Sequence, residues 1–147
     1  MRKDMELKPR LFFWEGSVDS QRLKQLLHEK GWALPGDLFD LLVLTGGGEI
    51  FESETILGPF RDADLGDNLF TYNEELRDRG LPDGYVVFHT GIAVSAVRLT
   101  DGRYVEFGLN DFEERGEYAS LEDWYLRLIR AVYGEHYGLP PQPLSSS

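Results

Sequence analysis

Three consecutive glycines, Gly46 to Gly48, are the first residues whose type and spacing could do chemistry, because glycine-rich loops can cradle a phosphate. Such a loop follows a strand, opens a helix and carries a lysine in the pattern Gly-x-x-x-x-Gly-Lys-Ser/Thr. Here the glycines follow a helical pattern of leucines, and the acids Glu49, Glu52 and Glu54, which repel phosphate, come next. We therefore interpret the glycines as a helix end and a tight turn, where a Cβ atom would clash.

The other reactive side chains lack the patterns that catalysis or metal binding needs. The chain has no cysteine and no Gly-x-Ser-x-Gly nucleophile elbow. The histidines His28, His89 and His136 are not spaced as metal ligands, and His89 lies in a strand-like segment where a hydrogen-bonded core or edge histidine is expected. The acids of residues 62–67 do not match a calcium-binding loop, because its glycine and final glutamate are misplaced. We expect no catalytic residue, no metal and no cofactor.

Acidic residues dominate the charge of the chain. Its 26 acids and 15 lysines and arginines sum to a net charge of −11, which disfavours nucleic acid and anionic membranes and favours a basic protein partner. The acids concentrate in residues 49–83, where ten acids face three arginines, and in residues 106–123, where seven face one. We predict that the partner contacts the first stretch, through Glu49, Glu52, Asp62, Asp64, Asp67, Glu74 and Glu75. The alternative for each of these acids is a solvated surface charge.

Four helices and a set of short strands are predicted to position these residues. Helical patterns cover residues 17–31, 34–46, 68–80 and 120–134, with N-caps expected at Ser17 or Asp19, at Asp67 and at Ser120. Strand-like segments cover residues 49–57, 85–90, 92–100 and 103–107, and Asp101-Gly102 predicts a type I′ hairpin turn. The aromatic cluster at residues 11–14 is expected to pack on the core.

The order of these elements shows no alternation of strand and helix and no internal repeat. It predicts an α+β fold, with an antiparallel sheet and helices packed mainly on one side. One domain is expected over residues 1–139, followed by a Pro- and Ser-rich tail at residues 140–147. The charged segment MRKDMELKPR lacks the apolar region of a signal peptide, and no apolar run is long enough to span a membrane. We therefore expect a cytoplasmic protein.

An ordered set of motifs resembles one known family. The stretch LPGDLFDLLVLTGGGEIF (residues 34–51) is similar to the signature of the SUKH superfamily, the SMI/KNR-type domain: an L-P-x-D/E opening, a hydrophobic helix and a Gly-Gly turn into a strand. GLPDGYVVFHTG (80–91) resembles the later strand of that family, AVRLTDGRYVEF (96–107) its next hairpin, and SLEDWYLRLI (120–129) its closing helix. The resemblance extends over residues 17–133.

This resemblance implies a protein-binding domain without enzymatic activity. Many bacterial members are immunity proteins that neutralise toxins, frequently nucleases, and a nuclease presents a basic cleft that clustered carboxylates can occupy. The resemblance thus implies a cognate toxin as the basic partner. The alternative is an SMI/KNR-type scaffold or regulatory interaction domain without a toxin partner, and a toxin gene next to this one would favour the first reading.

Overall fold

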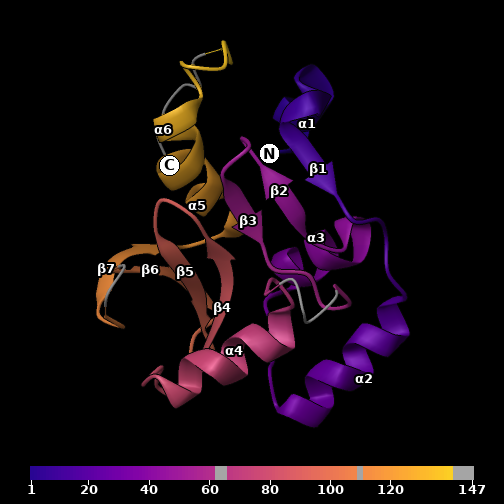
Figure 1. Cartoon of the computed structure of the whole chain (residues 1–147), viewed down its shortest axis with the longest axis vertical. Coiled ribbons are helices and arrows are strands. Elements are labelled where there is room, and N and C mark those ends of the chain that lie inside the picture. Colours follow the sequence, from indigo (N-terminus) through magenta and orange to yellow (C-terminus); the bar gives the residue numbers. More distant parts are fainter. Residues whose placement is uncertain (62–65, 109–110, 141–147) are drawn as a thin grey trace.

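A seven-stranded antiparallel sheet forms the centre of the molecule, with its strands in chain order from β1 to β7. The computed structural model describes residues 1–61, 66–108 and 111–140 (Figure 1). The strands are β1 (Phe12–Trp14), β2 (Gly48–Ile50), β3 (Glu54–Ile56), β4 (Tyr85–Thr90), β5 (Val94–Arg98), β6 (Arg103–Phe107) and β7 (Glu114–Tyr118). Each strand pairs with the next one along the chain, so β1 and β7 are the two edges of the sheet.

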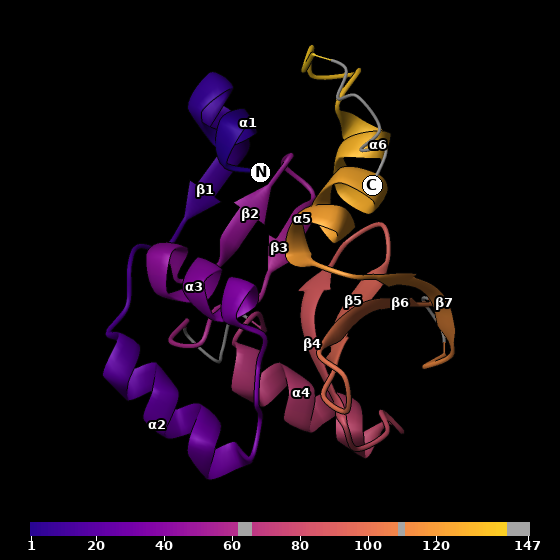
Figure 2. The same ribbon diagram turned by 180° about the vertical axis from the view of Figure 1, so that it is seen from behind.

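Helices precede the sheet, interrupt it and follow it. They are α1 (Arg2–Leu7), the short 3-10 turn η1 (Pro9–Leu11), α2 (Ser20–Lys30), α3 (Gly36–Thr45) and α4 (Leu69–Asp78). The last helix is continuous through α5 (Leu121–Trp124), the π-helical segment η3 (Tyr125–Arg130) and α6 (Ala131–Tyr133). Figure 2 shows α3 and α5 in front of the sheet, so both cover the same face. The predicted α+β fold with an antiparallel sheet is confirmed.

Local signals in the sequence set most helix ends. Asp19 caps α2 by accepting hydrogen bonds from the N–H groups of residues 21 and 22, and Gly31 ends it in the left-handed region at φ 72°. The Ser120 side chain accepts from the Asp123 N–H at the start of α5. The predicted cap of α4 is wrong by one residue, because the side chain of Asn68 caps that helix and Asp67 does not.

The three glycines end α3 and start β2, as the sequence predicts. Gly46 follows α3 at φ 72°. A Cβ atom on Gly47 would lie 2.6 Å from the Cα of Gly58, and a Cβ atom on Gly48 would lie 2.0 Å from the carbonyl oxygen of Phe13. The glycines are therefore required by close backbone packing between the end of α3, β1 and the segment after β3.

Three elements differ from the prediction. Strands β1 and β7 and helix α1 were not expected, because β1 has only three residues and β7, with the sequence ERGEY, is mostly charged. Both strands form by pairing with segments elsewhere in the chain, which local propensity does not register.

The β5–β6 hairpin is present, but of its two turn residues only Gly102 has a positive φ, and the N–H groups of Asp101 and Gly102 both bond to the carbonyl of Arg98. The predicted type I′ turn is therefore wrong.

Helix α4 completes the part of β4 that β3 leaves unpaired. Strand β3 pairs only with His89 and Thr90 of β4. The side chain of Asn73 accepts from the N–H of Val87 at 2.7 Å and donates to its carbonyl at 2.8 Å, as a neighbouring strand would. Arg77 donates to the carbonyl of Tyr85 at 2.7 Å. These bonds join α4 to the sheet and satisfy buried backbone groups.

Candidate protein-binding surface

Phe13 exposes its ring to solvent from the first strand of the sheet. Side chains alternate between the two faces of a strand, and in β1 Phe12 points into the core while Phe13 is 60% exposed. The expectation that the whole cluster of residues 11–14 packs on the core is therefore wrong for Phe13. Period-two alternation decides which aromatic is buried, and three residues are too few to reveal it in the sequence.

Phe13 lies at the end of a row of side chains on the outer face of the sheet. The register pairs Phe13 with Glu49, Glu49 with Thr55, and Thr55 with Thr90. All four side chains are exposed or partly exposed. Figure 1 looks onto this side of β1, β2 and β3, and Figure 2 shows α3 and α5 on the opposite side. We name this row, Phe13, Glu49, Thr55 and Thr90, the outer face.

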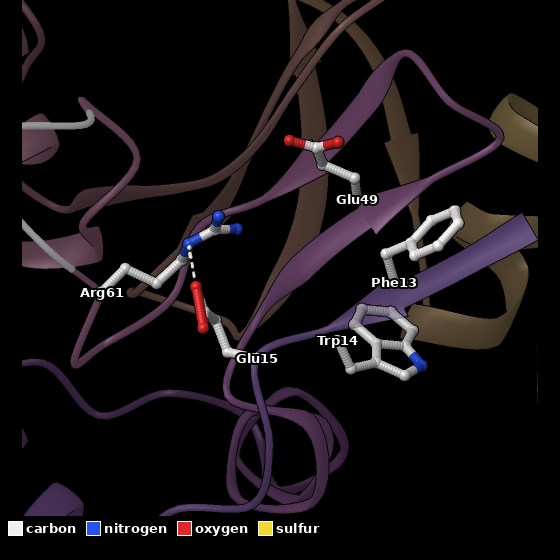
Figure 3. Close-up of a pocket in the computed structure, with 5 residues that line it drawn as sticks. All are labelled: Phe13, Trp14, Glu15, Glu49 and Arg61. Atoms are coloured by element: carbon white, nitrogen blue, oxygen red, sulfur yellow. Dashed lines mark ion pairs between the residues drawn. The ribbon is translucent and has the colours of Figure 1, made fainter.

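A shallow hollow of about 310 Å³ adjoins the outer face and is lined by Phe13, Trp14, Glu15, Glu49 and Arg61 (Figure 3). The guanidinium of Arg61 lies 3.2 Å from Glu15 and 2.9 Å from Asp67. Two carboxylates thus compensate the one cation of the hollow. No lysine or arginine of the described ranges forms an ion pair with Glu49. The hollow therefore has an uncompensated negative charge next to the Phe13 ring.

The predicted contact acids separate into two groups. Glu49 and Glu52 belong to the β2–β3 hairpin, whereas Glu74 and Glu75 lie on α4, toward the other end of the long axis in Figure 1. All four are exposed, and Glu74 is engaged by the Lys30 ammonium at 2.6 Å. Because the hairpin and α4 are far apart, these acids do not form one continuous patch.

Of the acids between the two groups, the structure describes Asp67, and its charge is not free. The side chain of Asp67 is 16% exposed and forms an ion pair with Arg61 at 2.9 Å, so its charge is compensated within the fold. Asp62 and Asp64 lie outside the described residues. The structure therefore places Glu49 beside the exposed Phe13, leaves Glu52 in the turn of the same hairpin, and separates Glu74 and Glu75 from both.

The second acidic stretch, residues 106–123, is largely compensated. Arg98 bonds to Glu114 at 2.6 Å and also to Glu117, and Arg103 lies 3.0 Å from Glu117. The Tyr118 hydroxyl donates to Glu106 at 2.7 Å. This stretch therefore contributes more to holding β5, β6 and β7 together than to an open acidic surface.

One acid of the first stretch, Glu54, is buried beneath the sheet in a hydrogen-bonded chain. Its carboxylate lies 2.9 Å from Nε2 of His89, and Nδ1 of His89 lies 2.8 Å from the Ser95 hydroxyl. Trp124 of α5 donates from Nε1 to the same hydroxyl at 3.0 Å. With His89 protonated at Nε2 only, every group has a partner: the indole donates to Ser95, Ser95 to His89, and His89 to Glu54.

Burial sets the charges in this chain of residues. It lowers the pKa of His89, and the hydrogen bond that His89 donates to Glu54 opposes this only in part, so the imidazole is neutral at pH 7. Burial by itself would raise the pKa of Glu54, but the bonds from His89 and from the Ile92 N–H outweigh it, and the pKa lies below its usual value. A neutral histidine therefore solvates an ionised carboxylate inside the protein.

The order Ser95, His89, Glu54 resembles a nucleophile, a base and an orienting acid. All three residues are at most 1% exposed, so a substrate cannot reach the Ser95 hydroxyl. Their partners include Trp124 in α5 and the Tyr133 hydroxyl in α6, which donates to Glu54 at 2.9 Å. The chain of bonds therefore attaches the last helix to the sheet. Of the two positions expected for a hydrogen-bonded His89, core or edge, the structure shows the core.

The turn between β2 and β3 has a strained backbone. Phe51 has φ 49° and Glu52 has φ 67°, values that residues with side chains rarely adopt. The buried Phe51 ring stacks on Tyr133 and Tyr137, with ring centroids 5.4 and 5.5 Å apart, which holds the turn in place. The exposed Glu52 is thus presented at a defined position beside α6.

The described part of the chain has neither a metal-binding cluster nor a helix that could span a membrane. No group of three or more His, Asp or Glu side chains there is arranged to hold a metal ion. None of the helices described has the length and hydropathy to cross a membrane.

Comparison with known proteins assigns no family to this chain. It matches no model of a protein family and no curated protein. The similarity to the SUKH superfamily therefore stays an interpretation of the sequence motifs, and function is argued from the outer face and its charges.

Proposed function

We propose that this protein is a non-enzymatic, protein-binding domain that neutralises a basic toxin, of the nuclease type, in the cytoplasm. The observation that carries the proposal is the 60% exposed ring of Phe13 beside the carboxylate of Glu49, which forms no ion pair with any described lysine or arginine. Aromatic side chains are enriched among the anchors of protein interfaces, so an exposed phenylalanine ring next to a carboxylate supports a contact surface on this face of the sheet.

The composition of the outer face suits a cationic partner. Buried aromatic anchors dominate the binding energy of many interfaces, and the polar residues around them set specificity. Here Glu49 flanks the Phe13 ring directly, and Glu52 lies on the same hairpin. A basic side chain of the partner can meet the carboxylate while an apolar one covers the ring. This arrangement favours a basic protein over an acidic or purely apolar one.

The remaining acids act at longer range. The net charge of −11 attracts a basic toxin from a distance, and Glu74 and Glu75 on α4 add to this field without touching the partner at the outer face. Attraction of this kind raises the association rate and weakens as salt screens it. Binding is therefore expected to depend on ionic strength through the association rate more than through dissociation.

Co-expression with the product of the neighbouring gene tests the proposal. Cells that make that product should survive only when this protein is present, and the two purified proteins should bind. Phe13→Ala should weaken binding by about 30-fold or more, a typical loss for an aromatic anchor. Leu44→Ala is the matched control, because Leu44 is 55% exposed on α3, away from the outer face.

Three results would count against this function. A harmless neighbouring product that nevertheless binds would favour the scaffold alternative. Equal losses for Phe13→Ala and Leu44→Ala would show that the outer face is not the contact surface. Affinity that does not change with salt would remove the electrostatic part of the mechanism.

A further inference from the structure

The two edges of the sheet differ in how they resist pairing with another chain. Strand β7 carries Glu114, Arg115 and Glu117, and charged side chains on an edge strand prevent unwanted strand addition. Strand β1 carries Phe12, Phe13 and no charged residue. In Figure 1 no further strand lies beyond β1 on the side away from β2. The β1 edge is therefore the one left open.

Backbone groups at this edge point outward. The carbonyl of Leu11 accepts from the Phe51 N–H at 2.8 Å, and the Glu15 N–H donates to the carbonyl of Gly47 at 2.9 Å. In an antiparallel pair, every second residue forms backbone hydrogen bonds with the neighbouring strand. The backbone N–H and carbonyl groups of Phe13 therefore point toward β2, and those of Trp14 point away from β2. Among the described residues these two Trp14 groups have no backbone partner.

The side chains beside this edge indicate the charge of a strand that could pair there. Glu15 and Asp67 take up the charge of Arg61, and Glu49 has no such partner among the described residues. A strand added outside β1 would lie roughly 10 Å from β2, because neighbouring strands are about 4.8 Å apart. An arginine of the added strand whose side chain points to the outer face can lie over the Phe13 ring and reach the Glu49 carboxylate.

We propose that β1 pairs with an extended, arginine- or lysine-bearing segment of the partner, which adds an eighth strand to the sheet at Trp14. The inference rests on the proposed function and specifies how its basic partner is held. A second copy of this chain could in principle use the same edge, but two chains of net charge −11 repel each other. The basic segment is therefore the occupant that the charges favour.

A defined peptide tests the inference without the natural partner. The probe is an acetylated octapeptide of alternating arginine and valine, titrated into the full chain and followed by amide resonances and amide hydrogen exchange. Strand addition gives the outward Trp14 N–H an acceptor, so its exchange should slow by about tenfold or more at saturating peptide. The Phe13 amide is already bonded to β2 and should change much less.

Matched variants distinguish binding at the β1 edge from nonspecific binding of the peptide. Phe13→Lys places a charge on the edge strand and removes the ring, so it should weaken peptide binding by about tenfold or more. Leu44→Lys makes the same change at a similarly exposed position on α3 and should leave binding within about twofold. An octapeptide of alternating glutamate and valine should not bind, because it places like charges beside Glu49.

Four results would overturn the inference. The peptide could bind without protecting Trp14, it could fail to bind, or the glutamate peptide could bind equally well. The chain could also form a dimer by itself that Phe13→Lys abolishes, which would make a second copy the occupant. Each of these leaves the proposed function open, because survival of toxin-producing cells and binding of the neighbouring product are measured separately.

Discussion

His89 makes the stability of this protein depend on pH in a way that can be measured. The imidazole is fully buried between Ser95 and Glu54, and burial lowers its pKa from the usual value near 6.5. As the pH falls below 6.5, the unfolded chain therefore binds a proton at His89 before the folded chain does. The stability that this neutral histidine contributes is fully present above pH 6.5 and is lost as the pH falls below it.

The size of the effect follows from proton linkage. One histidine that stays neutral in the folded state and titrates near pH 6.5 when unfolded lowers the free energy of unfolding by about 1.4 kcal/mol between pH 7.5 and about pH 5.5. His89→Gln keeps a donor toward Glu54 and removes the titration. The variant is expected to be less stable by about 2–4 kcal/mol at neutral pH, because the Ser95 hydroxyl loses a partner and packing around the ring is lost.

Urea unfolding, followed by tryptophan fluorescence at several pH values, gives the comparison. The difference in unfolding free energy between the parent and His89→Gln should shrink by about 1.4 kcal/mol from pH 7.5 to about pH 5.5. His28→Gln is the control, because His28 is exposed on α2. Parallel pH curves for the parent and His89→Gln would refute the assignment. So would a ring resonance of His89 in the folded protein that titrates near pH 6.5, a measurement that does not need a stable variant.

Four further substitutions, each measured by urea unfolding, test the close packing, the buried hydrogen bonds and an exposed ion pair. Gly47→Ala should destabilise by about 3 kcal/mol or more, because its Cβ would clash with Gly58, whereas Gly66→Ala, also at positive φ but in open space, should cost only about 1 kcal/mol. Trp124→Phe removes the donor to Ser95 and should cost about 1–2 kcal/mol; no loss would argue against the buried chain of bonds. Glu74→Gln should change stability by less than about 0.5 kcal/mol, since its ion pair is exposed.

Part of the site could be found from sequence and part could not. The excess of acids, and Glu49 as a candidate contact residue, can be read from composition and pattern. The burial of Glu54 is not, because its partner His89 is 35 residues away and nothing local distinguishes Glu54 from Glu52. The exposure of Phe13 likewise depends on pairing with β2, since a three-residue strand has no periodicity that tells its two faces apart.

The sequence by itself determined the elements whose causes lie within about four residues of chain. The cap at Asp19, the left-handed glycines that end α2 and α3, and the α+β order all follow from such local rules. Only the tertiary structure decided which charges stay free. Arg61 forms ion pairs with Glu15 and Asp67, which come from two different segments of the chain. No described cation forms an ion pair with Glu49. Coulomb energies depend on distance in space, and the spacing of residues along the chain does not fix that distance.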